Sequence, residues 1–245
     1  MNRIGLRFAV VSIALVLFLF PSSGQVKFQV GAGGGVLLPM GDYAGETTEY
    51  YAGTKYGLST GYTLQGKARV GIAGFTLVGG VNYSHLSNSG EGVVGRGSVD
   101  VSQSILTFKV GPEFTIPIPA APVTPYLGGN VAFHSISGKT KFQGLTAVPS
   151  SEFDVEGATR IGFGLNAGVV ISLGGLNLDL GAEYAFVNPI SKEWKSPTNA
   201  NRVDSYKSLN DEKDPLFNAS STDHFVGSTR SISTFAITAT LMFGI

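Results

Sequence analysis

Apolar and polar residues alternate along most of this chain after its first two dozen residues. The pattern is clearest in STFAITATLMFGI, residues 233–245, whose odd positions are Phe, Ile, Ala, Leu, Phe and Ile. The even positions of the same stretch are Thr, Ala, Thr, Thr, Met and Gly. A period of two residues indicates a β-strand with one apolar and one mostly polar face. We therefore expect a strand that separates an apolar environment from a polar one.

Seven further segments alternate in the same way. Their charged residues fall on the side opposite the apolar stripe, as expected where lipid lies on one side of a strand and a filled polar lumen on the other. Together with the C-terminal segment, these stretches predict eight strands, over residues 26–38, 58–71, 75–84, 102–115, 124–136, 160–173, 175–187 and 233–245.

The connections between the predicted strands alternate between long and short. Tight turns are expected near residues 71–74, 117–122 and 174–175, whereas long polar stretches occupy about 39–57, 86–101, 137–159 and 188–229. A soluble sandwich would also alternate, but membrane barrels in particular combine long extracellular loops with short periplasmic turns. The pattern predicts an all-β fold, an eight-stranded antiparallel up-and-down transmembrane β-barrel with four long extracellular loops.

This arrangement resembles the small eight-stranded outer-membrane β-barrel families, the group that includes the OmpA transmembrane domain, OmpX and OmpW-like proteins. The stretch TPYLGGNVAF, residues 124–133, and the C-terminal strand carry the resemblance. It implies a place in the cell outer membrane, contact with lipid and lipopolysaccharide, and insertion by the barrel-assembly machinery. The assembly signal commonly ends in an aromatic residue, whereas here Phe243 is followed by two more residues.

The N-terminus has the layout of a secretory signal peptide. Arg3 and Arg7 precede an apolar run over residues 8–20, and Pro21 and a Ser-Ser-Gly sequence follow it. The run is short for a membrane-spanning helix. We expect residues 1–24 to be the signal peptide and residues 25–245 to form the barrel domain.

Composition narrows the classes of function. Without the two arginines of the signal peptide, 15 basic residues face 17 acidic ones, so the mature net charge is about −2. This balance argues against a nucleic-acid partner, which needs a concentrated basic face. The chain has no cysteine, and its three histidines, at positions 85, 134 and 224, are far apart. We expect neither a metal site nor a cofactor; the glycine-rich GAGGG at residues 31–35 lacks the Lys-Ser/Thr of a phosphate loop and lies inside a predicted strand.

The predicted inward positions contain charges of both signs. An eight-stranded barrel encloses an interior just wide enough for side chains to fill, and unpaired charges there would be costly. We therefore expect a buried polar and ionic network, with a narrow porin-like channel as the alternative. The charged residues of this lumen are Lys27, Lys67, Arg69, Lys109, Glu113, Arg160, Asp179 and Glu183.

One short motif raises an enzymatic alternative. SHLSNSG, residues 84–90, resembles the His-x-Ser-Asn motif of lipid A 3-O-deacylases, and the resemblance implies His85 as general base and Ser87 as nucleophile. Such a pair needs an orienting carboxylate, and the candidates Glu91 and Asp100 are poorly spaced for it. We expect a protein with a structural or surface-interaction role rather than an enzyme, and keep the hydrolase as the second alternative.

The last long connection, over residues 188–229, is the remaining candidate for function. It is polar and mixed in charge, and loops of this length are usually functional or disordered. It could bind an extracellular ligand.

Overall fold

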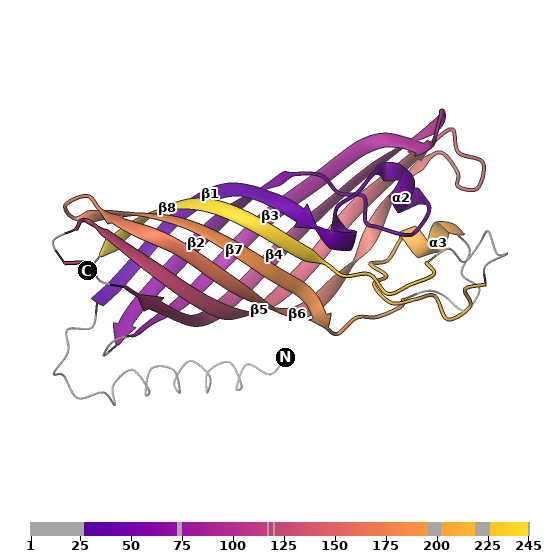
Figure 1. The fold of residues 1–245 in the computed structure, drawn as a ribbon. Coiled ribbons are helices and arrows are strands. Elements are labelled where there is room, and N and C mark those ends of the chain that lie inside the picture. Colours follow the sequence, from indigo (N-terminus) through magenta and orange to yellow (C-terminus); the bar gives the residue numbers. More distant parts are fainter. Residues whose placement is uncertain are drawn as a thin grey trace, which may run out of the picture.

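The computed structural model describes residues 27–72, 75–116, 118–119, 121–195, 202–218 and 226–244, so the expected signal peptide lies outside the described residues. Eight antiparallel strands follow one another round a closed barrel in chain order (Figure 1). Strand β8 pairs with both β7 and β1, which closes the ring and confirms the predicted fold class. The bounds are β1 Lys27–Met40, β2 Gly61–Ile72, β3 Phe75–Val93, β4 Arg96–Thr115, β5 Val123–Gln143, β6 Ser151–Ser172, β7 Leu176–Ile190 and β8 Ser233–Gly244.

The apolar stripes face outward and the polar residues face the lumen, as the alternation predicts. On β4, for example, Phe108 and Val110 are about half exposed, whereas Glu113 is 2% exposed. This is the reverse of a soluble protein, in which large apolar side chains are buried and charges lie outside. Exposed apolar side chains lie on all eight strands and include Phe28, Val30, Leu64, Leu77, Val81, Phe108, Val110, Leu127, Val131, Phe133, Phe163, Leu165, Leu180, Ile237, Leu241 and Phe243.

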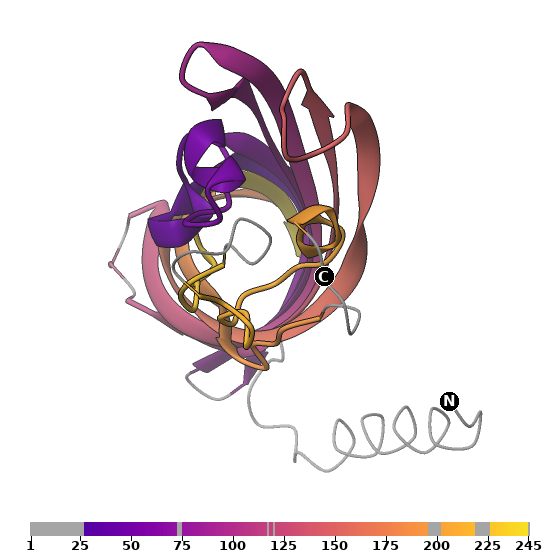
Figure 2. The same ribbon diagram turned by 90° about the vertical axis from the view of Figure 1, so that its right-hand side faces the viewer.

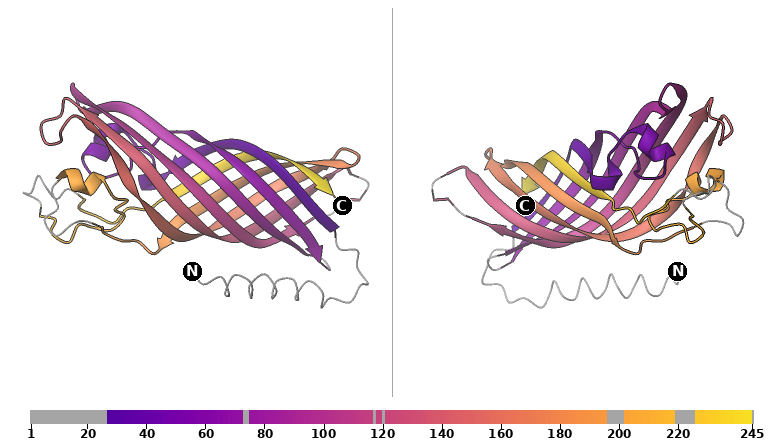
Figure 3. Two further views of the ribbon diagram at one scale, coloured as in Figure 1. Left: turned by 180° about the vertical axis from the view of Figure 1, so that it is seen from behind. Right: turned by 45° about the vertical axis from the view of Figure 1, so that its right-hand side comes forward.

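Strands β3 to β6 continue past the other four at one end of the barrel (Figure 3). The expected loops at 86–101 and 137–159 are therefore wrong in extent: only residues 94–95 and 144–150 connect these strands. Alternation persists in the extensions, but apart from Val93 at the end of β3 their outward residues are polar, so the apolar stripe ends before the strands do. The other two long connections occupy residues 41–60 and 191–232, close to the expected 39–57 and 188–229. We call the extended part of β3 to β6, residues 86–93, 96–105, 135–143 and 151–159, the wall.

The described residues of 41–60 and 191–232 fold together over the same end of the barrel, and we call them the lid (Figure 2). The lid contains a 3-10 helix, η1 Gly41–Tyr43, and two helices, α2 Thr47–Tyr51 and α3 Arg202–Tyr206. Lid and wall share one buried apolar core, in which the rings of Phe142 and Tyr206 lie 4.7 Å apart. None of the helices within the described ranges is long and apolar enough to cross a membrane.

Glycines of the GAGGG stretch allow β1 and β8 to approach closely. A Cβ atom on Gly35 would lie 1.8 Å from the carbonyl oxygen of Ile237, and one on Gly33 would lie 2.1 Å from that of Ala239. Such separations are far below van der Waals contact, so neither position accepts a side chain without a shift of the backbone. The glycines therefore serve closure of the barrel, inside a strand as expected.

Candidate functional site: the barrel interior and its mouth

The lower lumen, toward the end with short turns, holds a balanced group of two cations and two anions. Lys67 and Arg69 on β2 face Glu113 on β4 and Asp179 on β7. The Nζ of Lys67 lies 2.7 Å from Glu113 and 2.9 Å from Asp179, and Arg69 lies 2.7 Å and 3.0 Å from the same carboxylates. The hydroxyl of Tyr126 donates to Asp179 over 2.7 Å. The charges are matched in number, and each ion forms at least one hydrogen bond to an ion of opposite charge, although Nη1 and Nη2 of Arg69 form none.

A second ion pair crosses the lumen at mid-height. The Nζ of Lys109 on β4 lies 2.6 Å from Glu183 on β7. Two cavities of about 40 and 50 Å³ border on this pair, one on the side of Glu113 and the other on the side of His134. A water molecule needs roughly 10–15 Å³ of such space, so each cavity is large enough for a few waters. Lys109 and Glu183 line both cavities, so the ion pair lies between them.

Six of the eight expected lumen residues are thus brought together in ion pairs: Lys67, Arg69, Lys109, Glu113, Asp179 and Glu183. Lys27 begins β1, and its side chain lies outside the described part of the chain. Arg160 points inward from β6 but joins a separate group at the mouth of the barrel.

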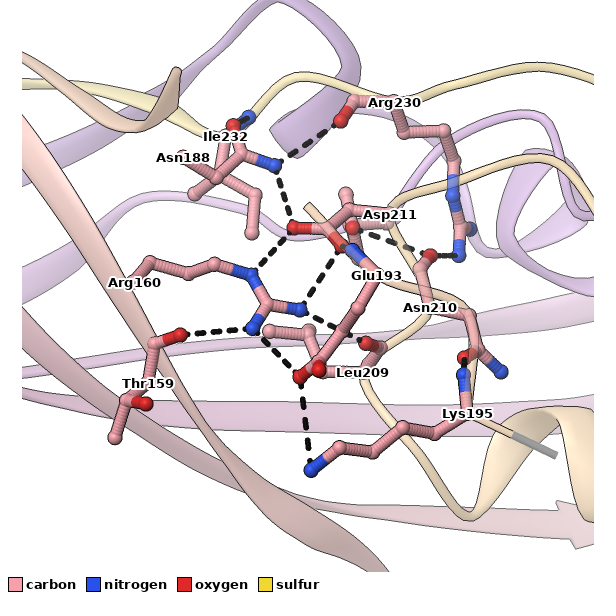
Figure 4. Close-up of polar contacts among 11 residues, drawn as sticks. Thr159, Arg160, Asn188, Glu193, Lys195, Leu209, Asn210, Asp211, Arg230 and Ile232 are labelled. Carbon is pink, nitrogen blue, oxygen red and sulfur yellow. Dashed lines mark hydrogen bonds and ion pairs between the residues drawn. The ribbon is translucent and has the colours of Figure 1, made fainter. Parts of the chain in front are cut away.

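Arg160 anchors the lid to the barrel (Figure 4). Its side chain is 1% exposed. Its Nε and Nη2 donate to the two oxygens of Asp211 over 2.7 and 2.9 Å. Its Nη1 donates to Glu193 and to the carbonyl of Thr159, both over 2.8 Å, and Nη2 also donates to the carbonyl of Leu209 over 3.3 Å. The guanidinium has five N–H donors, and these five contacts match that number.

The carboxylate of Asp211 also accepts hydrogen bonds on both of its oxygens. Besides the two bonds from Arg160, it accepts from the side-chain amide of Asn188 and from the backbone N–H of Glu193, both over 2.8 Å. The Oδ1 of Asn188 accepts the N–H of Ile232 over 2.6 Å. One carboxylate thus joins β6, the end of β7 and both ends of the last connection. Sequence reasoning missed Asp211, because it lies in an aperiodic polar stretch.

Arg230 joins the two halves of the lid. Its guanidinium lies 4.2 Å from the ring centre of Tyr56 and donates to the carbonyl of Lys55 over 3.3 Å and to the carbonyl of Asn210. The Tyr56 hydroxyl donates to the same Asn210 carbonyl over 3.3 Å. The first and last long connections therefore form one folded unit.

Buried tyrosines attach this unit to the wall. Tyr43 donates to Gln103 over 2.9 Å, and the hydroxyls of Tyr50 and Thr140 lie 2.7 Å apart. Burial raises the pKa of Tyr50 to about 12, because a tyrosinate would lose its hydration there. The pKa of Tyr43 is raised for the same reason. These phenols stay protonated, and can donate hydrogen bonds, over the physiological pH range.

His85 and Ser87 lie on the outward side of β3, but they are not hydrogen-bonded to each other. The Nδ1 of His85 lies 3.0 Å from the hydroxyl of Ser104, its cross-strand neighbour on β4. Leu86 between them points inward and is fully buried, and Ser87 is exposed. The nearest hydroxyl partner of the imidazole is therefore Ser104 rather than the expected nucleophile.

The two candidate carboxylates have other partners. Asp100 accepts from Ser89 over 2.6 Å, and Glu91 accepts the backbone N–H of Gly95 over 2.8 Å. The residue opposite His85 is Ser104, so a hydroxyl occupies the place from which a carboxylate would orient the imidazole. The described contacts assemble no triad here.

Of the two remaining histidines, His134 belongs to the described part of the chain. His134 lies in the lumen with its Nδ1 2.9 Å from Thr107, and His224 lies outside the described residues. Within the described ranges, no group of three or more His, Cys, Asp or Glu side chains is placed to hold a metal ion.

Neither a protein-family model nor any curated protein matches this chain. Two solved structures are similar in fold. Neisserial surface protein A is 14% identical, with 90% of this chain and 97% of that one covered and a TM-score of 0.47. Ail, the attachment invasion locus protein of Yersinia pestis, is 12% identical, with 90% and 100% covered and a TM-score of 0.42. At these identities, the similarity describes the course of the chain and assigns no function.

Proposed function

We propose that this protein is an outer-membrane β-barrel with a structural or surface-interaction role and an interior that does not conduct solutes. The observation that carries the proposal is that paired side chains and the lid cross the interior at three successive levels. The Lys67–Arg69–Glu113–Asp179 group closes the lower lumen, the Lys109–Glu183 pair closes its middle, and the lid closes the mouth.

The size of the exposed apolar belt supports the membrane location. On β4, exposed apolar side chains extend from Leu106 to Phe114, and Ile116 follows the end of the strand. These roughly ten residues, at about 3.4 Å per residue and a tilt of about 40°, span about 25 Å along the barrel axis. That height matches the apolar band of outer-membrane barrels. Tyr62 and Tyr83 are exposed near its upper border, where aromatic girdles lie.

An ordered lid supports a role at the surface. Long connections are usually either functional or disordered, and fixing each residue opposes folding by about 1–2 kcal/mol. The lid offsets this entropy with its shared core and the Arg160–Asp211 pair.

Single-channel recording in planar lipid bilayers tests the proposal. Refolded protein should insert without stepwise conductance, even at high voltage, because ion pairs block the path. Insertion is verified on the same sample by the faster gel mobility of the unheated barrel. Discrete conductance steps from inserted wild-type protein would overturn the closed interior and restore the narrow channel.

A further inference from the structure

The ion cluster of the lower lumen brings a nucleophile, a carboxyl group and a proton carrier within reach of one another. The Nζ of Lys67 lies 2.7 Å from Oε1 of Glu113 and 2.9 Å from Oδ2 of Asp179. The second contact places the amine within about 4 Å of the carboxyl carbon of Asp179, since a carbon–oxygen bond is about 1.2 Å long. A small movement then brings the reacting atoms to the roughly 3–3.5 Å of a near-attack geometry. A lysine amine that has lost a proton is a nucleophile.

The two carboxylates have different neighbours, which give them different roles. Glu113 accepts hydrogen bonds from Arg69 over 2.7 Å and from the side-chain amide of Asn166 over 3.1 Å, and these fix it beside the amine. A base held next to a nucleophile by further groups is the general arrangement of nucleophilic catalysis. Asp179 instead accepts the hydroxyl of Tyr126 on Oδ1 over 2.7 Å. This donor faces the oxygen on which negative charge develops when an amine attacks the carboxyl carbon.

The surroundings of the cluster favour loss of two charges. The side chains of Glu113 and Asp179 are 2% and 3% exposed, and that of Lys67 is 11% exposed. An amide is neutral, so its formation removes one buried cation and one buried anion, which are costly to keep away from water. Arg69 and Glu113 remain as a pair of opposite charges 2.7 Å apart. The adjoining cavity of about 40 Å³, lined by Lys67, Glu113 and Tyr126, has room for a released water molecule.

We propose that Lys67 and Asp179 form an isopeptide bond that ties β2 to β7 across the lumen. The Nζ of Lys67 attacks the carboxyl carbon of Asp179, a C–N bond forms, and the bond from that carbon to Oδ2 breaks. Glu113 carries two protons in succession from Nζ to Oδ2, which leaves as water, so the reaction needs no oxidant and no reductant. The hydroxyl of Tyr126 stabilises the charge on Oδ1 of the tetrahedral intermediate. The bond strengthens the barrel independently of any role at the surface.

Intact-mass spectrometry of the refolded chain tests the bond. The chain is weighed before and after refolding into vesicles, and we expect the refolded protein to lose the mass of one water molecule. After denaturation and trypsin digestion, Lys67 should be found in a branched peptide that joins residues 56–69 to residues 161–192. Fragmentation of this peptide locates the bond, and the gel mobility of the unheated barrel verifies folding on the same sample.

Three variants distinguish a covalent bond from an ion pair. Lys67→Arg keeps the positive charge but cannot form the amide, so its mass should not change on refolding. Asp179→Asn should lose ammonia in place of water, because the leaving atom is then the amide nitrogen. Glu113→Gln should slow the mass change by about 100-fold, the lower end of what a positioned general base contributes.

The other ion pair of the lumen supplies a matched control. Lys109 lies 2.6 Å from Glu183, but among the residues that the structure describes it contacts a single carboxylate. Without a second carboxylate to carry protons, this pair should remain an ion pair. Lys109→Arg should therefore lose one water molecule on refolding, as the wild type does.

Three results would overturn the bond. The first is a folded wild-type barrel that keeps its full mass. The second is a mass loss that persists in Lys67→Arg, since the water then comes from another site. The third is a branched peptide that joins Lys67 to Glu113 instead of Asp179. Conductance is recorded on the same samples, and a conducting barrel that contains the bond refutes only the proposed function.

Discussion

Asp211→Asn tests whether one buried carboxylate holds the lid closed. The substitution keeps the size and shape of the side chain and removes its charge. Asp211 is fully buried and accepts four hydrogen bonds, two on each oxygen: Oδ1 from Arg160 and the N–H of Glu193, Oδ2 from Arg160 and Asn188. An asparagine presents one oxygen and one NH₂ group, so in either orientation two donors face a donor.

The expected destabilisation of the lid follows from these contacts. A buried donor without an acceptor costs about 1–3 kcal/mol, and two of them cost roughly 2–6 kcal/mol. Loss of one partner of a buried ion pair is destabilising by about 3–5 kcal/mol. Arg160 retains Glu193, which is 37% exposed, so we expect the lower part of this range, about 3 kcal/mol. That free energy raises the population of the open lid about 150-fold.

Limited proteolysis of the refolded protein measures this population. Trypsin sites in the lid are Lys55, Lys192, Lys195, Arg202, Lys207, Lys213 and Arg230. When the lid closes faster than trypsin cuts, the cleavage rate follows the open population. We expect the lid of Asp211→Asn to be cut about two orders of magnitude faster, while the unheated barrel keeps its gel mobility. The neighbouring Glu212→Gln, which loses a hydrogen bond from Thr229 on an exposed side, should stay within about 0.5 kcal/mol of wild type.

Two results would refute this reasoning. If Asp211→Asn and Glu212→Gln are cut at the same rate, the carboxylate does not secure the lid. If Asp211→Asn fails to form the barrel at all, the lid is required for closure of the strands, whereas the structure places Asp211 outside the strand ladder.

Four other outcomes are expected. Glu183→Leu should destabilise the barrel by about 3 kcal/mol in urea unfolding from vesicles, and Lys109→Met/Glu183→Leu should recover most of this loss, because the double variant leaves no unpaired charge. Burial raises the pKa of Tyr50 from 10.0 to about 12, so its contribution to lid stability is fully present below pH 10 and is lost as the pH rises through 12; absorbance of tyrosinate at alkaline pH, together with lid proteolysis, checks this. Gly35→Ala should lower the urea midpoint, because its Cβ would lie 1.8 Å from a carbonyl oxygen of β8, whereas Gly66→Ala, with no atom within 4 Å, should not. Expression of the chain should leave the mass of lipid A unchanged, and loss of a 3-hydroxyacyl chain would restore the hydrolase hypothesis.

The strands could be predicted because lipid and lumen impose opposite demands on successive residues. Phe108 must face lipid and Lys109 must face the lumen, and this alternation needs no knowledge of the partner strands. The partners themselves could not be predicted. Lys67 contacts Glu113 and Asp179, which lie 46 and 112 residues further along the chain. Those contacts depend on the stagger with which the barrel closes, and alternation within a single strand carries no information about stagger.

The contacts between the lid and the barrel could not be predicted from the sequence either, for a related reason. The alternation on its strand correctly predicts that Arg160 points inward. Its partner Asp211, however, comes from an irregular segment. A buried ion pair between a strand and an irregular loop leaves no periodic pattern. On the lid side, the shared core likewise contains five tyrosines without regular spacing, Tyr43, Tyr50, Tyr51, Tyr56 and Tyr206.

The full length of the strands, in contrast, can be predicted from the sequence, because the apolar residues change from the outward to the inward face while the alternation continues. Below Tyr83 the exposed apolar residues of β3, Leu77 and Val81, point outward, but Leu86 points inward and is fully buried. On β4, Val99, Val101 and Ile105 are buried beneath the lid, and the exposed stripe begins at Leu106. The apolar stripe therefore changes sides where the wall meets the membrane belt. A search for a lipid-facing stripe stops at this inversion, although the strand continues.

This inversion also accounts for the His-x-Ser spacing. Above this inversion, the outward residues of β3 lie beyond the apolar belt, so polar residues are expected there. The inward residues face the core that the wall shares with the lid. His85, Ser87, Ser89 and Glu91 are the successive outward residues of that strand, so polar residues at every second position follow from strand geometry alone. The spacing would indicate chemistry only if the neighbouring strand supplied a carboxylate beside His85, and it supplies the hydroxyl of Ser104 instead.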